Sequence, residues 1–135
     1  MDLSEYTGIT FWAMAATSGR QVIRVQINDV NTDPRGDFCS ADGRTEKDNC
    51  YNGFAKDIML TNELSQYHVD FSELRQDPSW GFRPNPSKLD FNHVYAMNFE
   101  VPLPGCTTDT KATCAGPTAD VSFDVWIDDL YFVNR

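Results

Sequence analysis

Two adjacent carboxylates, Asp128 and Asp129, are the first residues of this chain that could do chemistry. They interrupt the segment 122–132, in which apolar and polar residues otherwise alternate. Alternation with a period of two is typical of a half-buried β-strand. Carboxylates beside the carbonyl oxygens at the end of a strand offer the oxygen ligands that Ca²⁺ prefers. We therefore expect either solvent or a cation at this pair.

Motifs for catalysis are almost absent. The sequence has no Gly-x-Ser-x-Gly nucleophile elbow, no His-Glu-x-x-His zinc motif and no glycine-rich phosphate loop. Glycosidases need two carboxylates that flank a cleft, and Glu100 with Asp124 could supply such a pair. Because nearly any sequence contains a pair of this kind, a small glycoside hydrolase is the less favoured alternative to a non-catalytic domain.

The four cysteines form two pairs that are close in sequence. Cys39 and Cys50 close one short loop, and Cys106 and Cys114 close another. Neither pair has the spacing or the histidine of a zinc site, so disulfides are favoured. Among the possible connectivities the local one fits best, because each pair lies in a polar loop between predicted strands. Disulfides indicate a secreted protein, whereas in a reducing compartment these residues would be small apolar side chains.

Strand patterns dominate the chain, and helix patterns are almost absent. We expect strands over residues 9–14, 21–28, 55–60, 66–71, 93–101 and 122–132. The first two are expected to form a hairpin through the turn Thr17-Ser18-Gly19. Short strands between loops rich in glycine and proline predict an all-β fold, an antiparallel β-sandwich with long disulfide-closed loops.

Length and charge narrow the choice of partners. A chain of 135 residues, 41% of them hydrophobic, can build one compact core, so residues 1–135 are expected to form a single domain. The formal net charge of −9 argues against nucleic acid and against anionic membranes as partners. No segment reaches the roughly 20 apolar residues of a membrane span, and the first residues lack the pattern of a signal peptide.

The order of several short motifs resembles a known family of domains. The motifs are Tyr6-Thr7-Gly8-Ile9-Thr10-Phe11-Trp12-Ala13, the strand 22–28, the first cysteine loop, the segment 66–74, Trp80-Gly81, and the strands 94–99 and 123–132. In this order they are similar to carbohydrate-binding modules of the galactose-binding-like jelly-roll type, which occur on secreted bacterial enzymes that degrade polysaccharides. The resemblance covers nearly the whole chain and implies a jelly-roll sandwich.

Modules of this type usually carry further strands before the one that begins near Gly8. The resemblance therefore implies either a trimmed domain, or an open sheet edge that a second copy or a neighbouring catalytic domain covers, since unpaired edges invite pairing. It also implies a structural Ca²⁺ at Asp128 and Asp129, completed by residues of those N-terminal strands. Their absence from the chain puts this site in question.

The resemblance places a sugar site on one face of a sheet. In such modules the strands corresponding to residues 22–28 and 94–101 share the sheet whose outer face commonly binds the glycan. If Tyr95, Met97 and Phe99 face the core, the outward side chains include Arg24, Gln26, Asn28, Asn98 and Glu100. Side chains of these types bind sugar hydroxyls. An ordinary solvated sheet face has the same polarity, and this alternative stays open.

Aromatic side chains could stack on the apolar face of a sugar ring. Tyr51 and Phe54 flank the first disulfide loop, and Trp80 lies in a proline-rich loop where no strand pattern explains it. Trp126 could form a second aromatic patch with Trp12 if both face outward. Alternatively, Trp80 caps one end of the sandwich, and at least one of the other two tryptophans packs in the core.

The leading interpretation is a secreted, non-catalytic module that binds plant cell-wall polysaccharide, of the β-glucan or xyloglucan type. A β-sandwich domain for protein interaction or adhesion is the alternative from another class. Apart from a possible structural Ca²⁺, no cofactor is expected.

Overall fold

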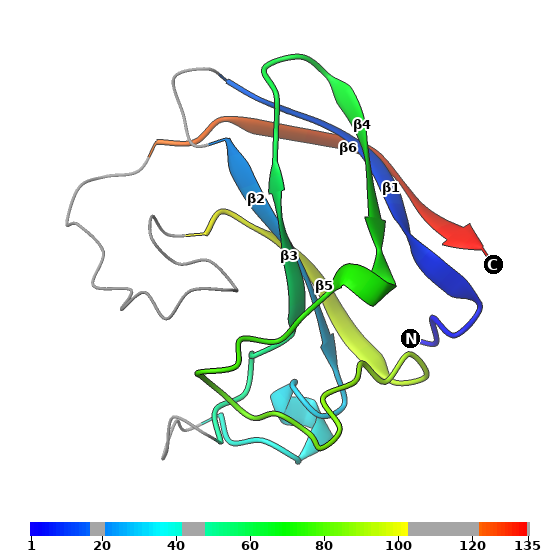
Figure 1. Cartoon of the computed structure of the whole chain (residues 1–135), viewed down its shortest axis with the longest axis vertical. Coiled ribbons are helices and arrows are strands. Elements are labelled where there is room, and N and C mark those ends of the chain that lie inside the picture. Colours follow the sequence, from blue (N-terminus) through cyan, green and yellow to red (C-terminus); the bar gives the residue numbers. More distant parts are fainter. Residues whose placement is uncertain (17–20, 42–47, 103–121, 135) are drawn as a thin grey trace.

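The computed structural model is a sandwich of two antiparallel sheets (Figure 1). It describes residues 1–16, 21–41, 48–102 and 122–134. The strands are β1 (Tyr6–Ala15), β2 (Val22–Asp29), β3 (Phe54–Met59), β4 (Ser65–Asp70), β5 (Val94–Glu100) and β6 (Val125–Asn134), and two short 3-10 helices are η1 (Pro34–Gly36) and η2 (Phe71–Glu73). The predicted all-β antiparallel sandwich is confirmed, and each predicted strand overlaps an observed one.

The two sheets have the strand orders β4-β1-β6 (sheet A) and β3-β2-β5 (sheet B). The predicted hairpin between the first two strands is wrong, because β1 and β2 are the central strands of different sheets. Each has one apolar face, and placing them in opposite sheets turns these faces toward each other. Among the described strands, only β2 and β3 are both consecutive and hydrogen-bonded neighbours, and the other connections pass from one sheet to the other, as in a jelly roll.

The core lies between the two central strands. Its innermost side chains are at most 1% exposed and include Ile9, Phe11 and Ala13 from β1 and Ile23, Val25 and Ile27 from β2. The ring of Phe11 joins both sheets, with ring centroids 5.9 Å from Tyr67 and 5.2 Å from Phe99. Burial of the isoleucine, valine and phenylalanine side chains among them stabilises the fold by about 1.5 to 3 kcal/mol each.

The two aspartates of the last strand change its phase. Between the pairs Trp12–Asp128 and Thr10–Tyr131, β6 advances three residues while β1 advances two, which defines a β-bulge. The extra residue is accommodated at Asp129, whose backbone φ of 48° lies in the left-handed region that aspartate tolerates better than most residues. Its amide donates to Asp128 Oδ1 at 2.8 Å. The break in alternation that the sequence shows is therefore a structural feature of the strand.

The segment between β2 and β3 is closed by the disulfide Cys39–Cys50, which confirms the local pairing predicted for these two cysteines. Cys106 and Cys114 lie outside the described residues. Among the residues that the structure describes, no helix is long and apolar enough to cross a membrane.

Candidate functional site

The predicted polar row lies on the outer face of sheet B. β5 pairs with β2, with Arg24 opposite Glu100 and Gln26 opposite Asn98, so the prediction that these strands are neighbours is confirmed. Tyr95 is not a core residue, because it occupies a register shift between β2 and β5 and is 40% exposed. The guanidinium carbon of Arg35 lies 4.9 Å from its ring centroid.

Arg24 is held by a carboxylate of the neighbouring strand. Its Nε donates to Asp57 Oδ1 at 2.7 Å and its Nη2 to Asp57 Oδ2 at 3.1 Å. The two side chains are only 17% and 19% exposed. This bidentate pair gives the guanidinium a defined orientation, but a ligand must compete with Asp57 for its donors.

A loop covers the middle of the predicted row. Gln26 is 8% exposed and Asn28 is 2% exposed, so the expectation that they lie on an open surface is wrong. Gln26 Nε2 donates to the carbonyl of Tyr51 at 3.1 Å. A Cβ added to Gly53 would lie 2.4 Å from Asn28 Oδ1, which shows how closely the backbone passes over this amide. Gln26 therefore helps to hold the loop before β3, and this loop covers Asn28. Of the row, only Arg24, Asn98 and Glu100 keep some exposure.

The predicted loop aromatics have different environments. Tyr51 is 54% exposed and Trp80 is 39% exposed, whereas Phe54 is 4% exposed and belongs to the core. The loops of Tyr51 and Trp80 are joined by Asn52, whose Nδ2 donates to the carbonyls of Asp77 and Trp80. Two partly exposed rings are thus carried on adjoining loops at one end of sheet B.

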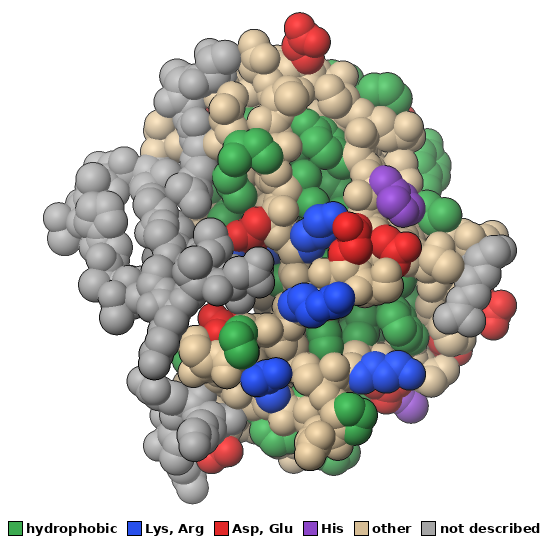
Figure 2. Space-filling view, viewed as in Figure 1, with side chains coloured by type: hydrophobic (Ala, Val, Ile, Leu, Met, Phe, Trp, Pro, Cys, Tyr) green, Lys and Arg blue, Asp and Glu red, His purple; other side chains and the backbone are tan. Residues whose placement is uncertain are grey.

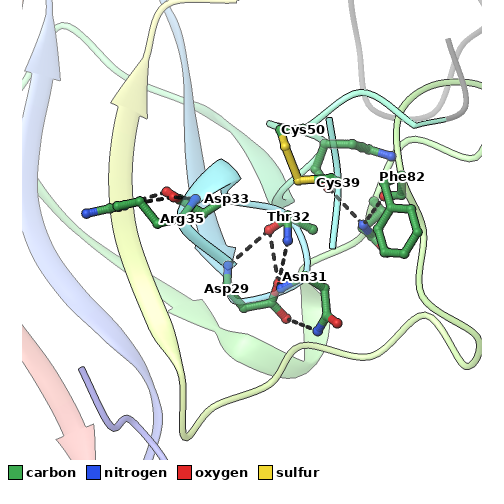
Figure 3. The surroundings of a disulfide bond; sticks show 10 residues. Asp29, Asn31, Thr32, Asp33, Arg35, Cys39, Cys50 and Phe82 are labelled. Carbon is green, nitrogen blue, oxygen red and sulfur yellow. Dashed lines mark hydrogen bonds and ion pairs between the residues drawn. A yellow bond between two sulfur atoms is a disulfide. The ribbon is translucent and has the colours of Figure 1, made fainter. Parts of the chain in front are cut away.

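Asp29 anchors the beginning of the disulfide-closed segment (Figure 3). Its buried carboxylate accepts hydrogen bonds from the amides of Asn31 and Thr32 at 3.0 and 3.1 Å, and from the amide of Asp90 at 2.9 Å. Further along, Arg35 Nε donates to Asp33 Oδ1 at 2.7 Å. Hydrogen bonding from Arg35 lowers the pKa of Asp33, because it stabilises the ionised carboxylate.

The outer face of sheet A carries three exposed aromatic residues. Trp126 pairs with Met14, and Tyr131 pairs with Thr10, so both side chains lie on the face that also bears Trp12. Trp12, Trp126 and Tyr131 are 36%, 63% and 59% exposed. We call these three residues the aromatic face. Both tryptophans point outward, as the second-patch hypothesis required, and neither packs in the core.

The aromatic face is extended, and polar side chains lie beside it. The partners of Trp126 and Tyr131 on β1 are Met14 and Thr10, four positions apart. At about 3.3 Å per residue, the two outer rings are anchored about 13 Å apart along the strand. β4 adds Gln66 opposite Trp12 and His68 opposite Thr10, and His68 Nδ1 lies 3.2 Å from Thr10 Oγ1.

Tyr131, Gln66 and His68 were not among the site residues that the sequence suggested. Simple alternation places Tyr131 on the same side as Ile127 and Asp129, and only the bulge moves it to the side of Trp126. The adjacent aspartates are the signal that could have revealed this change, because an interruption of alternation inside a strand indicates a bulge.

The acidic pair at the bulge is exposed. Within the described part of the chain, no group of three or more histidine, cysteine, aspartate or glutamate side chains could hold a metal ion. Calcium binding by Asp128 and Asp129 stays a prediction.

Comparison with known proteins brought no match, since no family model, no curated protein and no solved structure is significantly similar to the chain. The functional conclusion therefore depends on the geometry of the surfaces themselves.

Proposed function

We propose that the protein is a non-catalytic carbohydrate-binding module that binds polysaccharide through the aromatic face of sheet A. The observation that carries the proposal is the presence of three exposed rings, Trp12, Trp126 and Tyr131, on one side of two paired strands. Such rings offer flat apolar surfaces for the axial C–H groups of sugar rings. Because hydrogen-bonded strands hold their backbone, little conformational entropy of the protein is lost when a glycan chain binds.

The neighbouring polar groups suit a neutral glycan. Gln66, His68 and Asp128 lie on the same face and can donate to or accept from sugar hydroxyls. The net charge of −9 would repel a polyanion, so neutral β-glucan or xyloglucan chains fit best. The span of the aromatic face accommodates a short run of linked sugars along β6. The Cys39–Cys50 disulfide supports a secreted location.

The surface predicted on sheet B takes second place in this proposal. Arg24 is paired with Asp57, and Gln26 and Asn28 are buried. What remains there is Asn98 and Glu100 on the strand, with Tyr51 and Trp80 on the adjoining loops.

The test is Trp126→Ala, measured by calorimetry and affinity electrophoresis on β-glucan, xyloglucan, mannan and xylan. Stacking on an aromatic side chain is worth about 1 to 3 kcal/mol where it has been measured for nucleobases, so we expect affinity to fall by about tenfold or more. The melting temperature should change little, because the side chain is 63% exposed. The matched control is Tyr51→Ala, which removes an aromatic ring of similar exposure from the other surface.

Three results would contradict the proposal. If Tyr51→Ala abolishes binding and Trp126→Ala does not, the sugar site lies beside sheet B. If the unmodified protein binds none of the polysaccharides, a protein-interaction or adhesion domain becomes the better interpretation. Release of reducing sugar from any substrate would indicate a glycoside hydrolase.

A further inference from the structure

A cleft of about 510 Å³ opens beside η2, away from the aromatic face. Its volume lies within the range of about 300 to 1,000 Å³ that is usual for small-molecule sites. The apolar part of its lining consists of Tyr6, Phe54, Phe71, Leu74, Leu89 and Phe91. In Figure 2, apolar side chains (green) reach the surface just below the position that η2 has in Figure 1, and basic side chains (blue) lie on either side of them.

The apolar lining is firmly placed. Phe71 and Leu89 are each 5% exposed and Leu74 is 3% exposed, so most of their surface is packed in the core. The rings of Phe71 and Phe91 stack with centroids 5.7 Å apart and planes inclined by 30°. The cleft therefore offers a preformed apolar surface that includes an aromatic pair.

Two cations, Arg75 and Lys88, belong to the lining of the cleft. Arg75 Nη1 donates to the carbonyls of Ser72 at 2.5 Å and Leu74 at 2.8 Å, which fixes the guanidinium beside the opening. Within the described residues, Arg75 Nε and Nη2 and the Lys88 ammonium have no partner. The protein thus leaves positive charge unpaired next to an apolar floor, although its net charge is −9.

Three other polar side chains of the cleft, Asp70, Gln76 and Ser87, already have partners. The carboxylate of Asp70 accepts the amide of Ser72 at 2.7 Å. Gln76 donates from Nε2 to the carbonyl of Asn52 at 2.8 Å, and its Oε1 accepts from the hydroxyl of Ser87 at 2.6 Å. The charge that a ligand can complement is therefore positive, while the nearby carboxylate of Asp70 disfavours a second negative charge.

We infer that the cleft binds a small amphipathic monocarboxylate, with an apolar ring on the floor and its carboxylate between Arg75 and Lys88. A guanidinium pairs with a carboxylate through two parallel hydrogen bonds, and an ammonium adds a point charge. The apolar ring gains by leaving water for the Phe71 and Phe91 pair. This inference does not depend on the proposed function, because no residue of the aromatic face lines the cleft.

The test compares 3-phenylpropionate with its neutral analogue 3-phenylpropionamide, using amide chemical-shift titration of the intact protein. We expect the carboxylate to bind at least about tenfold more tightly than the amide. The shifts should centre on η2 and the segment from Ser87 to Phe91, and added salt should weaken binding.

Lys88→Gln is the decisive variant, because the side chain has no partner in the described part of the chain and its loss should not affect folding. It should reduce the preference for the carboxylate by several-fold. Arg83→Gln is the matched control: Arg83 is also exposed and basic but does not line the cleft, and affinity should stay unchanged. Equal binding of acid and amide, no binding of the acid at about 10 mM, or equal losses in both variants would overturn the inference.

Discussion

Replacement of Asp29 by alanine should destabilise the protein more than the loss of any exposed charge. Asp29 is 0% exposed. The two oxygens of its side chain accept hydrogen bonds from two segments that are far apart in the sequence. Oδ1 accepts from the amides of Asn31 and Thr32 and from the Thr32 hydroxyl, while Oδ2 accepts from the Asp90 amide and from Asn31 Nδ2. One carboxylate thus connects the turn after β2 with the segment before β5.

The size of the effect follows from these partners. Alanine leaves the amides of Asn31 and Asp90 without an acceptor, whereas the Thr32 amide keeps the backbone carbonyl of residue 29 at 3.1 Å. An unsatisfied buried amide costs about 1 to 3 kcal/mol, and the Thr32 hydroxyl and Asn31 Nδ2 lose their acceptor as well. Because water can reach some of these groups, we expect the free energy of unfolding to fall by about 3 to 5 kcal/mol, which is a large part of the roughly 5 to 15 kcal/mol usual for a protein. Asp29→Asn keeps one acceptor oxygen but turns an amide toward two donors, so it should cost about 2 kcal/mol.

Urea denaturation followed by tryptophan fluorescence measures these differences as shifts in the midpoint at constant slope. The control is Asp124→Ala, since this side chain is exposed and has no partner within the described residues. We expect the loss in free energy of unfolding to be largest for Asp29→Ala, smaller for Asp29→Asn and smallest for the control. A loss below about 1 kcal/mol for Asp29→Ala, or a larger loss for asparagine than for alanine, would refute the reasoning.

Three further predictions concern bonds, protons and metal. The variant Cys39→Ala/Cys50→Ala should lose about 3 kcal/mol of stability, as the chain-entropy relation gives for a sequence separation of 11, and an unshifted urea midpoint would contradict it. Arg35 lowers the pKa of Asp33, so this carboxylate's contribution to stability is complete above the ordinary aspartate pKa of about 4 and is lost as the pH falls through the lowered value. Asp33→Asn should therefore reduce the acid dependence of the urea midpoint, and an unaltered pH profile would count against the ion pair. If the β6 bulge binds calcium, added Ca²⁺ should raise the melting temperature, and Asp128→Ala should remove the rise; identical melting curves with and without Ca²⁺ would argue against the site.

Local sequence patterns predicted the strands well, because alternation depends only on neighbouring residues. The segment 21–28 shows its apolar and polar faces without reference to anything else, and β2 spans Val22–Asp29. Likewise, the short separation of Cys39 and Cys50 made their pairing the natural choice, and the disulfide is present. The neighbouring positions of β2 and β5 came from the resemblance rather than from alternation.

Exposure at the candidate surfaces could not be predicted in this way. Asn28 alternates outward as expected, yet it is 2% exposed because the backbone at Gly53 passes over it. Nothing in the pattern around Asn28 records which loop crosses that face. The η2 cleft is similar, since Tyr6, Phe71 and Leu89 come from three separate segments and each looks like an ordinary core residue on its own.

The sequence by itself determined where the strands run, which side chains alternate and where alternation is broken at Asp128 and Asp129. Only the tertiary structure decided that Trp12 and Trp126 share one face, because this requires β1 to pair with β6 rather than with β2. The physical reason is that alternation is a property of a single strand, whereas strand pairing is set by which apolar faces of distant segments bury each other best. The effect of the broken alternation also depends on strand pairing, because the bulge opposite β1 brings Tyr131 onto the same face as the two tryptophans.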